Sequence, residues 1–247
     1  MKSYIIRGIV GIAFILSFKN IYCQSTKSEI RGEPEAVAEA KAMVETMGGL
    51  KIWAEMKSIH FVHDWHFWNR VDSYREDEIL DLVDPFSWIE MKSEIYHRIR
   101  VYSPENNWNV TDGVFSVATE QQSKAYKNRA PFHIVRIAKG IAVGNPFYEV
   151  RIGKGEFRDS RQLEFYGPDG KMGGWIILNA KKEPLVWSVP EYKYTFGPMK
   201  SFGNLRMPDW ASTGNGAVTY QMISLTGGNQ PADSSLFVPP KEYRDKR

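Results

Sequence analysis

The 247-residue sequence predicts an α+β fold built on one curved antiparallel sheet. Three observations support this prediction: a helical pattern stands first, many short alternating segments with turn residues between them follow it, and a helical stretch interrupts these segments near mid-chain. No internal repeat and no long linker occur between residues 34 and 240. We therefore expect a single domain over 34–240, preceded by a polar leader at 24–33 and followed by a polar tail at 241–247.

Residues 1–23 are typical of a secretory signal peptide. Lys2 and Arg7 precede an apolar run of 11 residues, Gly8 to Phe18, whereas a membrane-spanning helix needs about 20 residues. The single cysteine, Cys23, is either removed with this segment or carries a lipid. We expect a protein that is exported and is periplasmic or associated with the outer membrane.

The charge and cysteine content exclude several classes of function. The chain has 32 basic and 29 acidic residues, and a mature chain that starts near Gln24 loses three basic residues and no acidic one, which leaves 29 of each. Nucleic-acid binding needs an excess of positive charge, so we expect no nucleic-acid partner. A chain without Cys23 also lacks disulfides, thiolate metal sites and a cysteine nucleophile.

The predicted elements follow the hydrophobic period along the chain. Pro34 opens a helix and Gly48-Gly49 ends it, because apolar residues recur at helical spacing between them. From Ser58 the period changes to two, and the strand SIHFVHDWHFWN (58–69) shows on one face Phe61, His63, Trp65 and Phe67. Residues 87–102 alternate more cleanly and predict one half-buried strand. Residues 118–142 look helical or irregular, and further strands are expected at 108–111, 114–117, 147–152, 162–166, 174–179, 184–189 and 217–225.

No metal site or catalytic motif is legible in the sequence. On a strand, His60 and His66 lie roughly 20 Å apart and His63 points to the opposite face, so the three cannot share a metal ion. The acidic run from Asp72 to Asp84 is interpreted as a solvated loop or strand edge. Glu90 and Glu94 flank Lys92 and are interpreted as surface charges. We therefore expect no metal, no cofactor and no catalytic residue, although enzymatic activity stays open.

A set of motifs in a fixed order resembles a known family. Met47-Gly48-Gly49 closes the first helix, Trp108 and Asp112-Gly113 follow a turn, and two further segments are Phe202 to Pro208 and Asp233 to Pro240. Together they resemble the LolA/LppX-like outer-membrane lipoprotein carrier superfamily, especially its uncharacterised exported members, over residues 40–240. The resemblance implies a strongly curved, unclosed antiparallel β-barrel (a half-barrel) with helices covering the concave face. It also implies that acyl chains bind between the sheet and the helices.

These observations lead to competing functional hypotheses. The leading one is a non-catalytic, monomeric binding or carrier protein for a lipid-like or amphiphilic ligand, such as a lipoprotein acyl chain, with an envelope protein as a further partner. Its apolar cavity is expected to contain Phe61, Trp65, Phe67, Ile89, Met91 and Ile95. The alternative is an accessory protein or enzyme of extracellular polysaccharide binding, uptake or degradation. That protein would bind sugar on the exposed rings of Trp175, Trp187 and Trp210, or use the acidic run or His60 and His66 as its base. A closed, filled core behind the same aromatic residues is the structural alternative to a cavity.

Overall fold

A computed structural model describes residues 29–70, 72–103, 107–155 and 160–244. The predicted signal peptide, including Cys23 and the expected start at Gln24, lies outside the described residues. Among the described residues, no helix has the length and apolar character needed to cross a membrane.

The described chain contains five α-helices, two short 3-10 helices and sixteen strands. The helices are α1 (Pro34–Thr46), α2 (Leu50–Glu55), α3 (Glu120–Arg129), η1 (Ala130–Phe132), α4 (Ile134–Val143), η2 (Ser234–Phe237) and α5 (Lys241–Arg244). The strands are β1 (Arg31–Gly32), β2 (Ser58–Phe67), β3 (Tyr74–Asp81), β4 (Ser87–Lys92), β5 (His97–Tyr102), β6 (Trp108–Thr111), β7 (Val114–Val117), β8 (Glu149–Gly153), β9 (Arg161–Tyr166), β10 (Met172–Leu178), β11 (Pro184–Val189), β12 (Tyr192–Phe196), β13 (Met199–Phe202), β14 (Leu205–Pro208), β15 (Trp210–Thr213) and β16 (Val218–Gly228).

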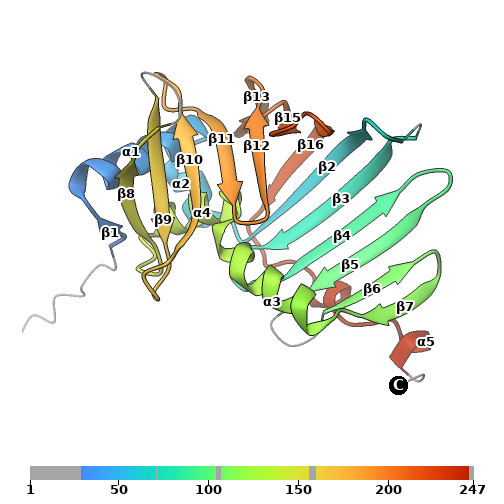
Figure 1. Ribbon diagram of the computed structural model, residues 1–247. Coiled ribbons are helices and arrows are strands. Elements are labelled where there is room, and N and C mark those ends of the chain that lie inside the picture. The colour runs from blue at the N-terminus through green and yellow to red at the C-terminus, as the bar shows by residue number, and fades with distance from the viewer. Residues whose placement is uncertain (1–28, 71, 104–106, 156–159, 245–247) are drawn as a thin grey trace, which may run out of the picture.

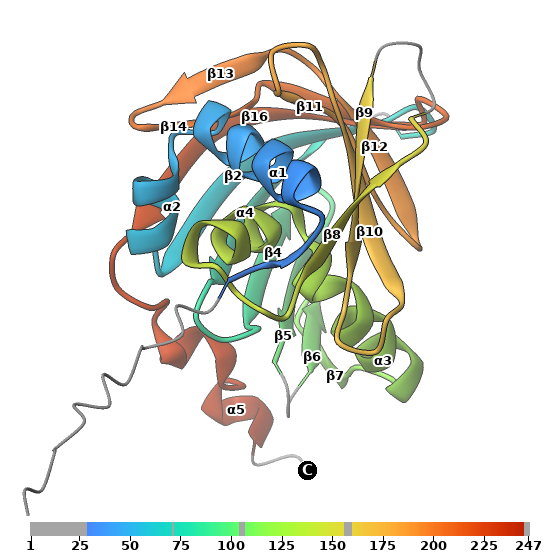
Figure 2. The ribbon, with the colours of Figure 1, turned by 90° about the vertical axis from the view of Figure 1, so that its left-hand side faces the viewer.

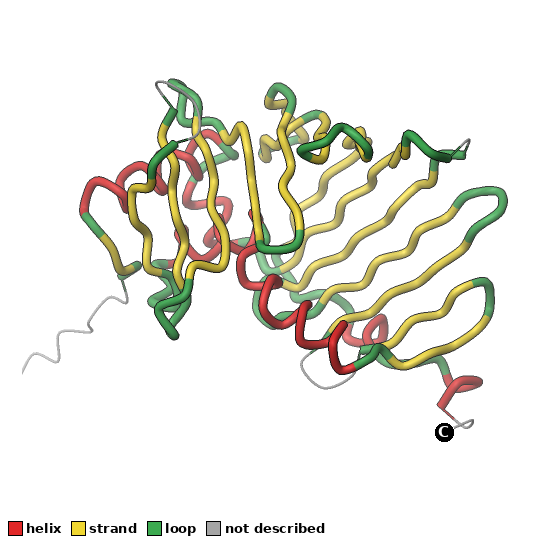
Figure 3. Tube along the Cα trace, viewed as in Figure 1, coloured by secondary structure: helices red, strands yellow, loops and turns green. Residues whose placement is uncertain are grey.

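Fourteen of these strands form one continuous sheet, in the order β1-β8-β9-β10-β11-β12-β15-β16-β2-β3-β4-β5-β6-β7. Every pairing in it is antiparallel except that of β1 with β8, and β13 and β14 form a separate hairpin. The sheet bends so that β8–β12 stand on one side and β2–β7 fan out on the other (Figures 1 and 3). It is not closed, because β1 and β7 are its two edges. The predicted α+β class with a curved, unclosed antiparallel sheet is confirmed.

Helices α1, α2 and α4 occupy the inside of the curve, where they bury apolar side chains against the sheet. Figure 2 shows α1, α2 and α4 between β8–β12 and the β16–β2 part of the sheet. Ala40 and Val44 of α1, and Val135 and Ala138 of α4, are completely buried. These side chains recur at three- and four-residue intervals, which places each set on one face of its helix.

Residues 87–102 form a hairpin, so the prediction of a single strand is wrong. Strands β4 and β5 are antiparallel, and the turn between them leaves Ile95 76% exposed. Because the turn reverses the chain, the residues that share a face differ from those predicted for a single strand. Ile89 now lies opposite Arg100, while Val101 lies on the other face in a small cluster with Trp108. The regular alternation hid this turn because both arms of the hairpin have the same period of two.

The acidic run is neither a loop nor a strand edge, because most of it forms β3, which pairs with β2 on one side and β4 on the other. Glu76 is 5% exposed and Asp81 is 2% exposed. The Asp81 carboxylate accepts hydrogen bonds from the backbone amides of Val83, Asp84 and Ala232 at 2.7–2.8 Å. The interpretation of this segment as solvated is therefore wrong.

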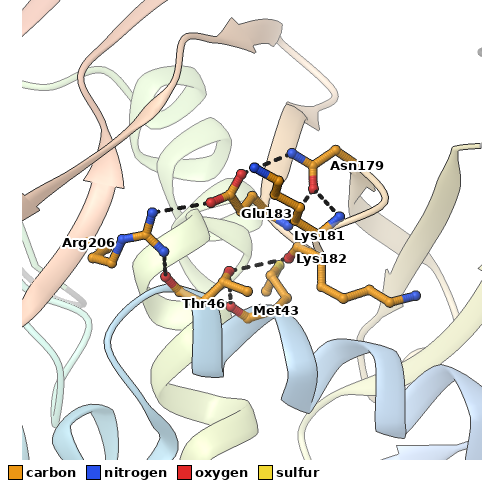
Figure 4. A network of polar contacts seen from close by, with 7 residues as sticks. All are labelled: Met43, Thr46, Asn179, Lys181, Lys182, Glu183 and Arg206. Atoms are coloured by element: carbon orange, nitrogen blue, oxygen red, sulfur yellow. Dashed lines mark hydrogen bonds and ion pairs between the residues drawn. The ribbon is translucent and has the colours of Figure 1, made fainter.

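Two of the sequence motifs behind the family resemblance contact each other. Gly48 has φ +123°, and a Cβ atom there would lie 2.6 Å from the carbonyl oxygen of Asn204, so only glycine fits. Beside this contact, the Arg206 guanidinium donates to the Thr46 carbonyl and to the Glu183 carboxylate, both at 3.2 Å (Figure 4). The hairpin β13–β14 thus fixes the end of α1 to the β10–β11 turn.

Two other motifs meet at the opposite end of the sheet. The indole N–H of Trp108 donates to the carbonyl oxygen of Phe237 at 3.2 Å, and Phe237 also packs against Phe86. The end segments take part in the fold as well: β1 brings part of the predicted leader into the sheet, and Tyr243 of the predicted tail stacks on Phe115.

Candidate functional site

A cavity of about 410 Å³ lies on the concave face of the sheet. Its wall comes from β2, β3, β4, β5, β11, β12, β14 and β16, and α3, η1 and α4 cover it. Ligand cavities for small molecules occupy roughly 300–1,000 Å³. The cavity is therefore large enough for one small ligand.

The structure brings together four of the six residues predicted to line an apolar cavity. Phe61, Trp65, Phe67 and Ile89 all face it. Met91 is buried on the same strand as Ile89 but does not line the cavity. Ile95 lies in the exposed β4–β5 turn, because the hairpin removes it from the strand face. Binding of a ligand by the four lining residues stays a prediction.

The helical cover is attached to both sides of the curved sheet. Tyr126 of α3 stacks on Tyr102 of β5 with the ring centroids 4.2 Å apart. Arg136 of α4 donates to the backbone carbonyls of Asp84 and Phe86, at 3.0 and 2.7 Å. On the other side, the indole N–H of Trp187 in β11 donates to the carbonyl of Phe132 at 2.9 Å. These contacts attach α3, η1 and α4 to the sheet on both sides of the cavity.

Aromatic rings form much of the wall. Trp65 lies between Tyr74, Tyr194 and Tyr220, with ring centroids 4.9–6.3 Å apart. Burial raises the pKa of all three tyrosines above the usual value, so their hydroxyl groups stay protonated at neutral pH. The wall therefore offers apolar ring faces together with neutral hydroxyl groups.

An acidic cluster interrupts this aromatic wall. Its members are His63 on β2 and Glu76 and Glu78 on β3, and all three line the cavity. The Glu76 carboxylate accepts the indole N–H of Trp65 at 2.9 Å, and the Nδ1 atom of His63 lies 3.6 Å from the same oxygen. Burial, followed by the charge of Glu76, raises the pKa of Glu78 to about 8. The sequence pattern did not predict this cluster, because the segment that forms β3 was interpreted as a solvated loop or strand edge and not as a strand that pairs with β2.

Arginines form the second polar group in the cavity. Arg100, Arg129 and Arg136 line it, and the Arg129 guanidinium lies 5.8–5.9 Å from the rings of three tyrosines. Neither Arg100 nor Arg129 forms an ion pair with another described residue, although both lie near Glu78. His133 adds no charge at neutral pH, because burial lowers its pKa to about 3. The wall therefore carries more positive than negative charge.

The residues proposed for sugar binding or catalysis are divided between the cavity, which Trp187 shares with Glu76 and Glu78 of the acidic run, and other parts of the molecule. His60 lies on the outer face, 3.1 Å from Asp77, and His66 is exposed on the same face. Trp187 lines the cavity, whereas the Lys193 ammonium lies 5.2 Å above the ring of Trp175. Trp210 is 41% exposed beside a second pocket of about 280 Å³.

Comparison with known proteins gives structural likeness only. No protein-family model and no curated protein sequence matches the chain. A DUF1329 family protein from Desulfovibrio piger is 6% identical over 83% of this chain and 97% of its own, with a TM-score of 0.49. MucB is 12% identical over 85% of this chain and 65% of its own, with a TM-score of 0.24, and the MucA/MucB complex of Pseudomonas aeruginosa matches with a TM-score of 0.24. With TM-scores below 0.5 these likenesses assign no family, so the resemblance to the carrier superfamily stays a prediction beyond the curved, unclosed sheet itself.

Proposed function

We propose that the chain is an exported, non-catalytic binding or carrier protein of the cell envelope, and that its ligand is a single amphiphilic molecule held in the cavity. The observation that carries this proposal is the cavity of about 410 Å³ under α3, η1 and α4, whose wall combines aromatic rings with charged groups. A purely structural core at this position would be filled, because protein interiors are close-packed. Export rests on the signal peptide predicted at residues 1–23.

The apolar part of the wall would bind the hydrocarbon part of the ligand. Phe61, Trp65 and Phe67 from β2 face Trp187 and Tyr194 across the concave side. A chain of about 12 methylenes would gain on the order of 10 kcal/mol before the costs of ordering, at about 0.8 kcal/mol for each buried methylene. This gain is sufficient for a useful affinity.

The charged part of the wall favours an anionic head group. Arg100 and Arg129 face the cavity without a carboxylate partner of their own among the described residues. A carboxylate or phosphate head group would supply the missing negative charge through charge-assisted hydrogen bonds. A fatty acid or an acyl chain of a lipoprotein fits the apolar wall, and the fatty acid also fits the arginines.

The polysaccharide alternative has less support. The three tryptophans that would bind sugar are distributed over the cavity, the outer face and a second pocket, so they do not offer one stacking platform. An envelope protein partner stays a prediction of its own, since no residue of the described chain identifies one.

Binding of a fluorescent fatty acid tests the proposal. We expect saturable binding of about one molecule per chain, and a weaker affinity in Trp65→Ala and in Arg100→Gln. Trp210→Ala is the matched control, because it removes a tryptophan that does not line the cavity, and it should bind like the parent protein. Native mass spectrometry of protein purified from an envelope fraction would then identify a co-purified ligand. Absence of fatty-acid binding, together with a polysaccharide as the co-purified ligand, would refute the proposal.

A further inference from the structure

The acidic cluster in the cavity is assembled by the pairing of two strands. His63 on β2 lies directly opposite Glu76 on β3, and Glu78 lies two residues further along β3 on the same face. One ligand atom from each residue lies within 4.8 Å of the corresponding atoms of the other two. The three side chains therefore converge on one point at the cavity wall.

One polar atom of this cluster is buried without a hydrogen-bond partner, whereas the Glu76 carboxylate accepts the Trp65 indole N–H. His63 is 5% exposed, and its buried Nδ1 atom has no hydrogen-bond partner among the described residues. At 3.6 Å from the Glu76 carboxylate, that atom is beyond hydrogen-bonding distance. A buried imidazole beside one buried and one half-buried carboxylate is costly unless a positive charge or a further donor satisfies it.

We propose that His63, Glu76 and Glu78 form a binding site for one divalent zinc ion, with a fourth coordination position open to the cavity. One imidazole nitrogen and two carboxylate oxygens are ligands that zinc accepts, and three protein ligands with one open position are typical of zinc sites that bind a further molecule. The site is independent of the amphiphile proposed above, because all three ligands come from the protein.

The geometry needs only a small adjustment to hold the ion. With zinc–ligand bonds of about 2.0–2.2 Å, the ligand atoms of a tetrahedral site lie roughly 3.4 Å apart. The present separations, of up to 4.8 Å, exceed this by an amount that rotation of the two glutamate side chains can remove. The arginines weaken the attraction for a cation, but they also favour an anion at the open position, where it would complete the coordination.

The same two strands provide a matched control. His60 and Asp77 also face each other across β2 and β3, at 3.1 Å, but they lie on the outer face. That pair contributes a single carboxylate and both side chains are more than one-third exposed. This pair has the same types of side chain, an imidazole and a carboxylate, but it lacks a third ligand and is exposed to solvent, so it should not hold an ion.

Zinc binding to the tag-free full chain tests the inference, by isothermal titration calorimetry and by metal analysis after dialysis. We expect one zinc ion per chain, an affinity lowered by roughly tenfold or more in His63→Gln and in Glu78→Gln, and an unchanged affinity in His60→Gln. Circular dichroism shows whether each variant is folded, and Co²⁺ added to the parent protein should give the intense visible absorption of a tetrahedral site without any mutation. Failure of the parent chain to bind zinc or Co²⁺ would overturn the inference, as would full affinity in His63→Gln and Glu78→Gln. Fatty-acid binding by the metal-free protein is measured separately, so the two proposals fail independently.

Discussion

The two halves of the concave face differ in how they are filled. Under α1, α2 and α4, side chains such as Phe165, Leu163 and Ile176 are completely buried. Under α3, η1 and the first residues of α4, half-buried rings such as Trp65 and Tyr194 surround a cavity of about 410 Å³. One curved sheet thus contains a packed core at one end and a hollow at the other. The difference teaches that uncharged side chains let a helix pack directly onto the sheet, whereas the charged groups in the cavity wall leave a space between sheet and helix.

The largest expected effect is a loss of stability on truncating a buried ring, and it should differ between the two halves. Phe165→Ala removes a completely buried ring from the packed half, and it should lower the free energy of unfolding by about 3–5 kcal/mol. Trp65→Ala enlarges a space that already exists, and it should cost much less, on the order of 1 kcal/mol. Urea unfolding of both variants measures these values. Equal losses would mean that Trp65 belongs to a filled core and would break the comparison.

A substitution at the boundary between the halves should have an intermediate effect. A Cβ atom on Gly173 would lie 1.9 Å from the ring of Phe132, the last residue of η1. Gly173→Ala therefore has to displace this ring, and we expect a loss of about 1–3 kcal/mol. Gly170→Ala in the preceding turn meets no atom within 4 Å, but it is strained at φ +72°. Gly167→Ala, with only ordinary or slightly tight contacts beyond 3.3 Å, is the better control in thermal unfolding.

Acid should destabilise the hollow half through His133. Burial lowers its pKa from 6.5 to about 3, so between these values the unfolded chain binds a proton that the folded chain does not. Stability is therefore complete above pH 6.5 and falls as the pH decreases toward 3. At pH 5 we expect a loss on the order of 1–2 kcal/mol, since water in the cavity screens part of the effect. His133→Gln should remove this part of the pH dependence when unfolding is measured from pH 7 to pH 5, and an unchanged slope would contradict the prediction.

The smallest effect concerns the start of the helical cover. Thr119 accepts the Gln122 amide at 3.2 Å, and the Gln122 side chain accepts the Thr119 amide at 2.9 Å, which forms a capping box for α3. Thr119→Ala should cost about 1 kcal/mol, and Thr119→Ser should retain most of the stability. Hydrogen exchange should show the loss as faster exchange in α3, with the amides of α1 unaffected. Equal changes in both helices would mean that the cover is not a separate unit.

The sequence predicted the structure best where neighbouring residues alone determine a helix end, a strand or a turn. Pro34 and Gly48-Gly49 marked the first helix, and the alternation in 58–67 placed Phe61, Trp65 and Phe67 on the concave side. The hairpin at 87–102 could not be predicted from such a pattern, because polar and apolar residues alternate in both of its strands and the turn between them does not interrupt this alternation. Asp112 and Gly113, with φ of 48° and 80°, show the contrast, since their residue types mark a turn directly.

The acidic cluster was missed for a different reason. Glu76 and Glu78 have the same residue type as solvated surface acids, and it is the pairing of β3 with β2 on one side and β4 on the other that buries Glu76 and half-buries Glu78. One indication was present, since Tyr74, Glu76, Glu78 and Leu80 alternate with the remaining residues of the segment. The register of two paired strands determines which residues face each other. The residues of one strand alone do not reveal that register.

The short strand β7 has a practical consequence for handling the protein. Among the strands of the described chain only β6 pairs with it, and Val114 and Val117 are 69% and 56% exposed. Tyr243 near the C-terminus stacks on Phe115 and donates to the carbonyl of Gly113 at 3.3 Å, so the last helix shields this edge. Unshielded strand edges pair with one another. A C-terminal affinity tag would therefore be attached next to the segment that contacts this edge, and we expect an internal tag in an exposed turn to leave these contacts intact.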